Sequence, residues 1–397
     1  MNDTVLAETL RDWSQEAGVP HDLAQRVLAR RQVRRRRLAV PVVAGLATAA
    51  VVVAALVAGG TVGPVRTDDG RGTPAAGGPR DELHADTAHN PPQDVVLAGD
   101  VAVSAIVTYV RVPAEPDGWQ TLQRRYAVAN PTTGRYEPRN WTYAAVAPGL
   151  ATAAMLEGPL PSSQVGFVDL ATGTVTHWVQ LDHPVASLAW SPDGSTVLAT
   201  AYDGDPDLQK PEGNDSFRIG DAKRTGFVLV DVTAGTAEFH SVPPDLLGGG
   251  RADFGWTLDG QGVRSPSGPP SEKFFDLQGR PVTGADDTAY NSNLSLDAAQ
   301  FPLSSPDGRY TITRDSGLET AITDNETGIV FRQEALQVLA WVDDERVIVL
   351  AGCSKPCDGT SEFRNALALM RYDGTYLAPL TAPRKGVDDW AFQLTPR

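Results

Sequence analysis

The sequence predicts an all-β domain on the outer side of a membrane, preceded by one membrane-spanning helix. Three observations predict this arrangement. Residues 38–60 form an uncharged apolar run directly after a cluster of arginines, and residues 61–93 have the Gly, Pro, Asp and Thr content of a flexible linker. From Val95 onward, short apolar runs alternate with turn residues and no long amphipathic helix appears. This last pattern is typical of all-β domains.

The apolar run and the basic residues before it set the expected topology. No side chain from Leu38 to Val65 is ionisable, and about 20 apolar residues in a helix cross the hydrocarbon core. Basic residues that flank a span stay in the cytoplasm. We therefore expect a single-pass protein of the cell membrane, whose residues 38–60 contact the bilayer and whose C-terminal domain is extracytoplasmic. A cleaved signal peptide and a buried core helix are the alternatives. The arginines are Arg30, Arg31, Arg34, Arg35, Arg36 and Arg37.

Residues 1–37 are expected to form a small cytoplasmic head. Apolar residues at helical spacing between Val5 and Trp13 predict one helix, and Gly18 and Pro20 end it. Asp22 can cap a second helix. The expected organisation is a helical head at 1–37, a transmembrane helix at 38–60, a flexible tether at 61–93 and a β domain at 94–397.

The charge is divided unevenly between these parts. The whole chain has a formal net charge of −15, yet residues 1–37 carry eight Arg and five Asp or Glu. The remainder is therefore strongly acidic, which disfavours nucleic acid as a partner of the outer domain. Arginine greatly outnumbers lysine, and Ala, Gly, Pro and Val are abundant, as in proteins of high-GC bacteria.

The two cysteines lie in the expected outer domain. Cys353 and Cys357 enclose three residues in the sequence CSKPC. In an oxidising compartment such a pair can form a structural disulfide, which is the interpretation we favour. A redox or metal pair is the alternative, but redox pairs usually enclose two residues and no further ligand is nearby.

The outer sequence repeats. A β-rich run followed by a turn of Asp or Asn with Gly recurs six times, with a mean spacing of about 48 residues between its glycines. A second element lies between these turns and consists of a strand, an Asp-Gly type turn and another strand, as in SLAWSPDGSTVLAT and FPLSSPDGRYTIT. The glycines of the first element are Gly134, Gly173, Gly235, Gly279, Gly328 and Gly374.

Each repeat thus holds about four strands, and a single sheet of that size cannot bury both faces. Radial packing of such sheets buries them, which predicts a β-propeller. We expect six blades, with seven as the alternative. Residues 388–394 are expected to close the ring as the innermost strand of the blade begun by residues 95–112. Tryptophans recur at one position of the repeat and are expected to pack between blades: Trp190, Trp256, Trp341 and Trp390.

The units at Ser191–Gly194 and Ser305–Gly308, both SPDG, resemble the repeats of TolB-like propellers and more loosely those of WD-repeat propellers. The resemblance covers residues 95–397 and implies a fold, not an activity. The Trp-Asp dipeptide of true WD repeats is missing, and so is the G-x-S-x-G motif of peptidases that carry a propeller.

The layout of head, span and outer domain is similar to that of single-span actinobacterial propeller proteins and of membrane-bound anti-sigma factors. The second resemblance implies a regulatory transmembrane protein. It rests on the layout alone, since the head lacks the His and Cys pattern with which that family binds zinc.

One candidate metal site is present in the longest repeat. Asp203, Asp205 and Asp207 alternate in YDGDPDLQKPEGND, and oxygen ligands at alternating positions suit Ca²⁺. Leu208 and Asn214, however, stand where an EF-type loop needs Gly and Glu. We favour a solvated acidic loop, and no cofactor is otherwise indicated.

No catalytic set can be chosen from the sequence. The histidines are scattered, and no Gly-rich loop opens a helix. We expect a membrane-anchored, non-catalytic propeller that binds a protein, peptide or glycan outside the cell. The alternatives are the anti-sigma-like regulator and an extracytoplasmic enzyme with its active site at the propeller mouth.

Overall fold

A computed structural model describes residues 82–213, 216–243, 250–265, 274–282, 301–315, 318–352, 364–385 and 389–397. The chain divides into two compact units between Thr67 and Asp68, and all described residues belong to the second. The expected helical head, the arginine cluster and the span at 38–60 lie outside the described residues and stay predictions. Among the described residues, no helix is long and apolar enough to cross a membrane.

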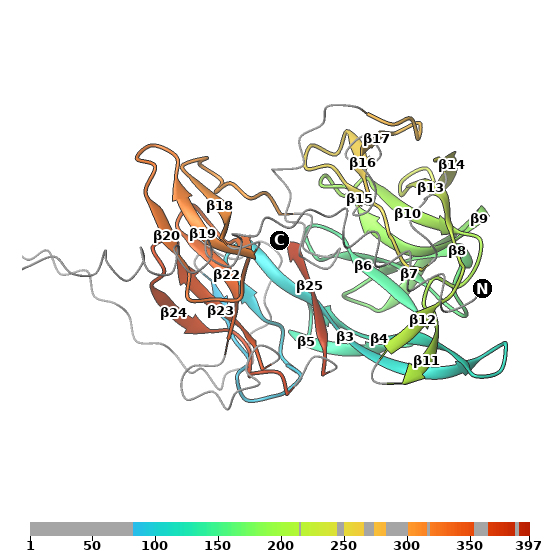
Figure 1. Ribbon diagram of the computed structural model, residues 1–397, viewed down its shortest axis with the longest axis horizontal. Coiled ribbons are helices and arrows are strands. Elements are labelled where there is room, and N and C mark those ends of the chain that lie inside the picture. The colour runs from blue at the N-terminus through green and yellow to red at the C-terminus, as the bar shows by residue number, and fades with distance from the viewer. Residues whose placement is uncertain are drawn as a thin grey trace, which may run out of the picture. The chain divides into compact units, whose positions relative to one another are not determined.

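The described chain is all-β, as expected, and its strands pair antiparallel (Figure 1). The first sheet contains β1 (Leu83–His84), β2 (Leu97–Ala98), β3 (Val101–Ala114), β4 (Trp119–Asn130), β5 (Arg135–Arg139), β11 (Leu208–Gly213), β12 (Ser216–Ile219) and β25 (Ala391–Pro396). The second contains β6 (Tyr143–Val146), β7 (Thr152–Leu156), β8 (Ser162–Asp169), β9 (Thr174–Trp190), β10 (Thr196–Tyr202), β13 (Arg224–Asp231) and β14 (Thr236–Ser241).

Three smaller sheets follow along the chain. They contain β15 (Gly255–Trp256), β16 (Gly262–Arg264) and β17 (Phe274–Asp276); then β18 (Tyr310–Asp315), β19 (Leu318–Asp324) and β20 (Val330–Arg332); and finally β21 (Gln337–Trp341), β22 (Arg346–Ala351), β23 (Ala366–Arg371) and β24 (Tyr376–Pro379). In each, strands adjacent in the sequence are adjacent in the sheet.

The 17-residue strand β9 belongs to two successive four-stranded meanders. Its first part pairs with β8, and its last residues, Val185–Trp190, pair with β10. The second sheet is therefore two repeats of the sequence joined by one continuous strand. Such a strand carries the chain from the outer edge of one meander to the inner edge of the next.

The repeated turns have the chemistry that the sequence predicts. Ser191 Oγ donates to Asp193 Oδ1 over 2.6 Å, and Ser305 Oγ donates to Asp307 Oδ1 over 2.6 Å. The glycine after each aspartate has φ near +70° or +75°, a conformation that glycine adopts without strain. The six glycines of the other repeated turn all have positive φ as well.

The hydrophobic core lies between consecutive sheets. One cluster joins side chains of β3 and β4 to those of β7 and of β22, and another joins β8 and β9 to β10 and β13. Two further clusters join β10 and β13 to β15–β17, and β18 and β19 to β21–β23. Face-to-face packing of successive meanders is the organisation of a β-propeller.

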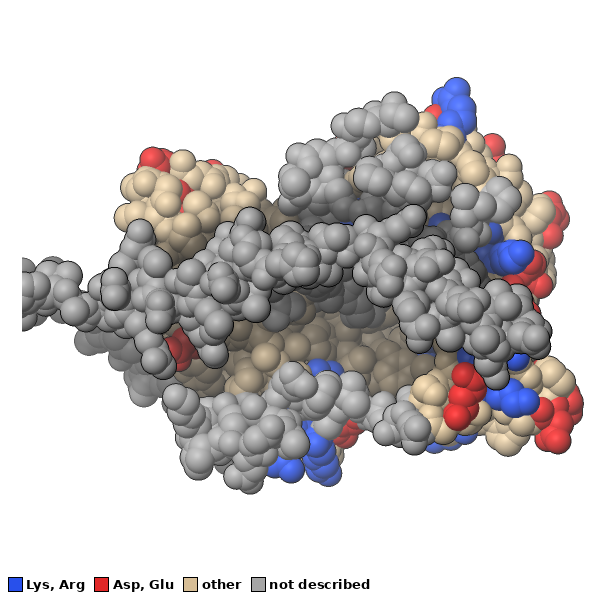
Figure 2. Space-filling model, viewed as in Figure 1, with Lys and Arg blue, Asp and Glu red and all other residues tan. Residues whose placement is uncertain are grey.

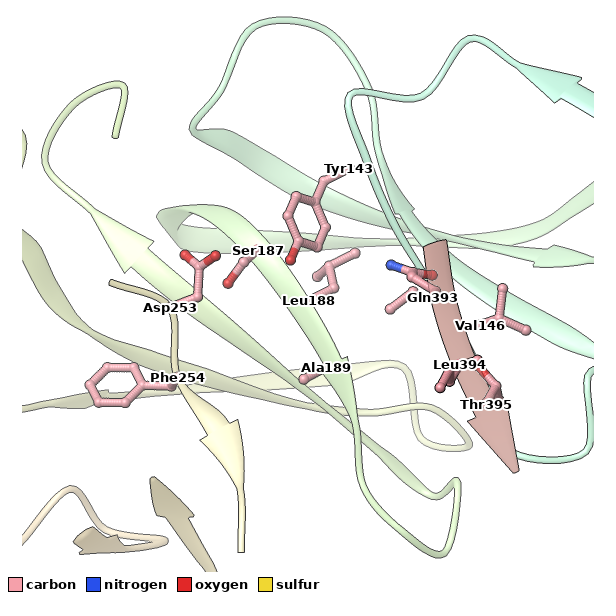
Figure 3. A pocket seen from close by; sticks show the side chains of 11 residues that line it. Tyr143, Val146, Ser187, Leu188, Ala189, Asp253, Phe254, Gln393, Leu394 and Thr395 are labelled. Atoms are coloured by element: carbon pink, nitrogen blue, oxygen red, sulfur yellow. The ribbon is translucent and has the colours of Figure 1, made fainter. Parts of the chain in front are cut away.

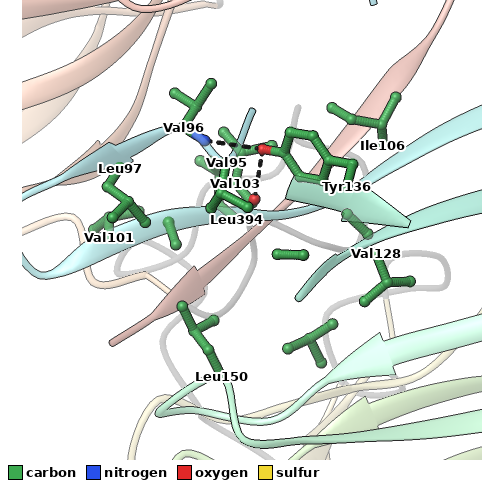
Figure 4. Close-up of a cluster of buried hydrophobic side chains, with 14 of the residues drawn as sticks. Val95, Val96, Leu97, Val101, Val103, Ile106, Val128, Tyr136, Leu150 and Leu394 are labelled. Atoms are coloured by element: carbon green, nitrogen blue, oxygen red, sulfur yellow. Dashed lines mark hydrogen bonds between the residues drawn. The ribbon is translucent and has the colours of Figure 1, made fainter. Parts of the chain in front are cut away.

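The C-terminal strand closes the first sheet. β25 pairs antiparallel with β3, from Ala391 opposite Val107 to Pro396 opposite Val101 (Figure 1). This confirms the expected closure, shifted by a few residues. Tyr136 secures the same region: its hydroxyl donates to the carbonyl of Val103 over 2.8 Å and accepts from the amide of Val96 over 3.2 Å (Figure 4).

The folded domain begins earlier than the expected boundary at residue 94. β1 pairs with β2, and the side chain of Arg397 donates to Glu82 over 2.8 Å. Asp86 is buried and accepts hydrogen bonds from the amides of Gln93 and Asp94. Residues 82–93 are therefore part of the domain, because buried polar contacts rather than apolar periodicity hold them.

Charged side chains of both signs lie side by side on the face drawn in Figure 2. On the described part of that face the acidic character is thus interspersed with basic groups. A mixed surface of this kind gives solubility without a strong field of one sign.

Candidate functional site: a projecting arm and its ion-pair cluster

The hairpin of β3 and β4 is longer than its sheet. Residues Val101–Val107 of β3 are buried, whereas Thr108–Ala114 alternate between half-buried and exposed. The pairing continues to the end, where Ala114 lies opposite Trp119. A turn with Gly118 at φ +81° reverses the chain. The outer half of the hairpin therefore extends beyond the core as a regular ladder.

A second hairpin widens this extension. β11 pairs with β4 through Leu208 opposite Thr121 and Gln209 opposite Gln120, and β12 pairs with β11. We call residues 108–125, 208–213 and 216–219 the arm. Figure 1 shows β11 and β12 beside β4. The hairpin of β11 and β12 is inserted between β10 and β13, so two separate repeats of the sequence contribute to the arm.

Asp207 fastens the arm at its base. Its carboxylate accepts from Arg124 Nη1 over 2.6 Å and from Arg251 Nε over 2.7 Å. All three side chains are largely buried. Arg124 lies on β4, Asp207 directly precedes β11, and Arg251 precedes β15. One carboxylate thus connects both hairpins of the arm to the wall of the domain.

The network continues inward through Asp253. Arg251 Nη1 donates to Asp253 Oδ2 over 2.9 Å, and the hydroxyl of Tyr202 donates to Asp253 Oδ1 over 2.7 Å. The ring of Tyr143 lies 5.5 Å from the guanidinium carbons of both Arg124 and Arg251. Two arginines and two carboxylates therefore balance one another, and an aromatic face covers the two cations.

These contacts determine the protonation states. Burial opposes the ionisation of Asp207, but the hydrogen bonds and positive charges of Arg251 and Arg124 outweigh burial and lower its pKa to about 2. The pKa of Tyr202 is raised by burial and by the negative charge of Asp253. Asp207 is therefore a carboxylate and Tyr202 a neutral phenol at neutral pH.

A small cavity lies beside the cluster (Figure 3). Its volume of about 20 Å³ leaves room for about one water molecule. Its wall comes from four segments that are distant in the sequence, and Figure 3 shows Tyr143, Ser187 and Asp253 together at one end. The labelled wall residues are Tyr143, Val146, Ser187, Leu188, Ala189, Asp253, Phe254, Gln393, Leu394 and Thr395.

The structure separates the three aspartates of the candidate calcium site. The carboxylate of Asp207 is paired with Arg124 and Arg251. Asp203 Oδ1 accepts from the amide of Lys223, and Asp205 Oδ1 accepts from the amide of Asp207. Calcium would have to compete with two guanidinium groups for Asp207. Whether calcium binds at these residues stays untested.

Among the described residues, the one group of acidic and histidine side chains close enough to share an ion is Asp86, His89 and Asp94. Asp86 already accepts from four backbone amides and from the ring of His89. These bonds lower its pKa although burial opposes ionisation. The group therefore stabilises the loop that precedes β2.

The recurring tryptophans are buried and pack between repeats, as expected. Trp190 Nε1 donates to the carbonyl of Ala145 over 2.8 Å, and Trp341 Nε1 donates to that of Leu303 over 2.8 Å. Trp256 makes the same bond to Ala189. In each case the acceptor belongs to the preceding repeat, so each indole joins two consecutive meanders.

Other expected site residues cannot be placed. Cys353 and Cys357 lie outside the described residues, and the expected disulfide stays a prediction. Conversely, Arg124, Arg251 and Asp253 had no motif that indicated their role. Asp207 stood out in the sequence, but its partners come from segments 83 and 44 residues away.

The sequence matches no protein-family model and none of the curated proteins. Solved structures with a similar arrangement include TolB from Acinetobacter baumannii, at 19% identity and a TM-score of 0.36, covering 74% of this chain and 65% of that chain. Another is the acylaminoacyl peptidase of Pyrococcus horikoshii, at 13% identity and a TM-score of 0.36, with 75% and 47% covered. This chain spans less than two thirds of either protein. The fold assignment rests on the strand order and packing described above.

Proposed function

We propose that this chain is a membrane-anchored, extracytoplasmic β-propeller that binds a protein, peptide or glycan and has no catalytic role. The observation that carries the proposal is the arm, a sheet that leaves the core and is fixed in place by a buried ion-pair cluster. A domain that only needed to fold would gain nothing from projecting strands, since half-buried strands contribute little apolar burial.

The exposed composition of the arm supports binding. Tyr109 is 39% exposed and Ile219 is 48% exposed. The guanidinium of Arg111 lies 5.1 Å from the centre of the Phe217 ring. Tyrosine, arginine and large apolar residues are the types enriched in protein interfaces. The arm thus offers a surface of suitable chemistry, held rigidly by Asp207.

The charged groups beside the cavity favour a structural role over catalysis. Arg124, Arg251, Asp207 and Asp253 are bonded to one another, and the adjacent cavity holds about one water molecule. A general acid or base needs a free proton position next to a substrate. We therefore assign the cluster to positioning the arm.

We also propose six blades. Each of the six proposed blades contains one of the six glycine turns. The blades are the repeat formed by β25 and β3–β5, the two meanders that share β9, and the three smaller sheets. The proposed anchor is the apolar run at residues 38–60 with the six arginines on its cytoplasmic side.

Proximity labelling tests the proposed function. A peroxidase joined by a flexible linker after Arg397 should biotinylate extracytoplasmic proteins reproducibly when the full chain is expressed in membranes. A matched fusion of the peroxidase to residues 1–67 alone serves as the control. Labelling identical to that control, or protection of the C-terminal domain from protease added to intact cells, would contradict the proposal.

A further inference from the structure

The arm carries two cations at directly opposed positions. Lys210 of β11 pairs with Arg218 of β12 in the antiparallel register, so the two side chains stand on the same face. Like charges directly opposite one another destabilise a strand pair. No carboxylate of the described residues lies within ion-pair distance of either side chain. An anionic group placed between the two side chains would offset this repulsion.

The strand that bears Arg218 is also the last in its sheet. The order of the described strands is β1-β2-β3-β4-β11-β12, so β12 has a neighbour on one side only. All residues of β12 are exposed except Phe217, which is half-buried. An exposed edge presents backbone amide and carbonyl groups with which another strand can pair.

The two faces of this edge differ in chemistry. Arg218 stands on the face that it shares with Lys210, whereas Phe217 and Ile219 stand on the opposite face, because side chains alternate along a strand. A strand added beside β12 would therefore place one side chain opposite Arg218, on the face of the two cations, and the side chains before and after it opposite Phe217 and Ile219. The matching sequence alternates acidic and apolar residues.

We propose that the arm docks an extended, acidic segment of a protein partner, which pairs with the edge of β12 and directs a carboxylate at Arg218 and at Lys210 behind it. This proposal rests on the proposed binding function and names the partner chemistry. The strongly acidic character of the rest of the chain supports the choice, since two directly opposed cations are a distinct feature on it.

The test uses the full chain in detergent micelles and a fluorescein-labelled peptide of four Val-Glu repeats. Fluorescence anisotropy at low salt should show saturable binding, and a peptide of four Val-Lys repeats should not bind. The double variant K210E/R218E should weaken binding tenfold or more. A matched control, R364E/K385E, reverses one exposed arginine and one exposed lysine elsewhere and should bind as the wild type. No saturable binding by the wild type, or equal weakening in the control, overturns the proposal.

A single variant separates binding from folding. Lys210→Glu replaces the repulsive pair with an attractive one, so it should raise the thermal stability of the arm while weakening peptide binding at least threefold. Loss of binding together with lower stability would instead indicate damage to the fold and would overturn the assignment of Lys210 to binding.

Backbone pairing has its own readout. An added strand uses alternate amides for its hydrogen bonds with β12. Two methylated peptides are compared, one with N-methyl groups on all valines and one with N-methyl groups on all glutamates. One of the two should lose binding, and the other should bind as the unmethylated peptide does. Equal binding of both methylated peptides overturns strand addition. Proximity labelling separates failure of this proposal from failure of the proposed function. If K210E labels the same partners as the wild type at the same levels, the arm is not the docking site, but the proposed binding function still holds. If neither protein labels a partner, the proposed function itself is wrong.

Discussion

The guanidinium group of Arg251 binds the carboxylate of Asp207 through two nitrogens, with Nε 2.7 Å from Oδ1 and Nη2 2.5 Å from Oδ2. This two-point contact fixes the relative orientation of both groups. Because Asp207 also holds Arg124, the carboxylate joins the base of the arm to the segment before β15.

Asp207→Asn should destabilise the domain by about 3–5 kcal/mol, since it leaves two buried arginines without their shared counter-charge. Urea unfolding followed by tryptophan fluorescence measures the change, and hydrogen exchange should rise at residues 119–125 and 208–213. Asp205→Asn is the matched control, because Asp205 accepts one local amide bond and should cost about 1 kcal/mol or less. Equal effects of the two substitutions would contradict the role of the cluster.

The same carboxylate should produce a pH dependence. Its pKa is about 2 in the folded protein against 3.8 for an ordinary aspartate, because the arginines outweigh burial. A lowered folded pKa gives stability that is present above about pH 4 and is lost as the pH falls toward 2. The difference in unfolding free energy between the wild type and Asp207→Asn should therefore shrink by about 2 kcal/mol over this range. A difference independent of pH would show that Asp207 is not ionised in the fold.

Trp190→Phe should cost about 1–3 kcal/mol, because it leaves the carbonyl of Ala145 without its donor and creates a gap between two meanders. The comparison is Trp178→Phe, at a side chain that is 36% exposed, which should change stability by about 0.5 kcal/mol or less. Thermal unfolding of the wild type and both variants measures these two changes in stability. A change in Trp178→Phe as large as that in Trp190→Phe would argue against packing between repeats.

Calcium should not bind at residues 203–207. The carboxylate of Asp207 is paired with two arginines, and those of Asp203 and Asp205 each accept a hydrogen bond from a backbone amide. Isothermal calorimetry of the full chain with millimolar calcium should give no heat beyond dilution, in the wild type and in Asp203→Asn alike. A heat of binding that Asp203→Asn removes would establish the calcium site instead.

Cys353 and Cys357 are expected to be joined by a disulfide when the protein is made in an oxidising compartment. Alkylation with iodoacetamide without reduction should leave the intact mass unchanged, and alkylation after reduction should add two labels. Cys357→Ser should add one label without reduction. Two labels on the unreduced wild type would show that the pair is free.

The turns and the closing strand were predictable because their chemistry is local or repeated. The Ser-Pro-Asp-Gly turn at residues 191–194 needs no distant partner, and the position of Trp390 in its repeat indicated that the C-terminus returns to the first sheet. The arm was not predictable in the same way. Its pairing of Leu208 with Thr121 inserts a hairpin of one repeat beside another, and no periodicity encodes that contact.

The partners of Asp207 in the ion-pair cluster could not be predicted from the sequence either. The spacing of Asp203, Asp205 and Asp207 suggested a shared ligand, yet the charge that satisfies Asp207 comes from Arg124 and Arg251. The sequence favoured a solvated acidic loop at these residues, which is wrong for Asp207, because tertiary structure buries its carboxylate between two arginines from distant segments.

The fastening of Arg397 to Glu82 has a mechanical consequence. Glu82 and Arg397 lie at one seam of the described domain, where a two-residue ladder between β1 and β2 and this ion pair join the two segments. Any tension transmitted along the segment before Glu82 therefore strains these few bonds first. The strand β25 pairs with β3 over six positions further inward, so this pairing would hold the first sheet closed even if the β1–β2 ladder opened.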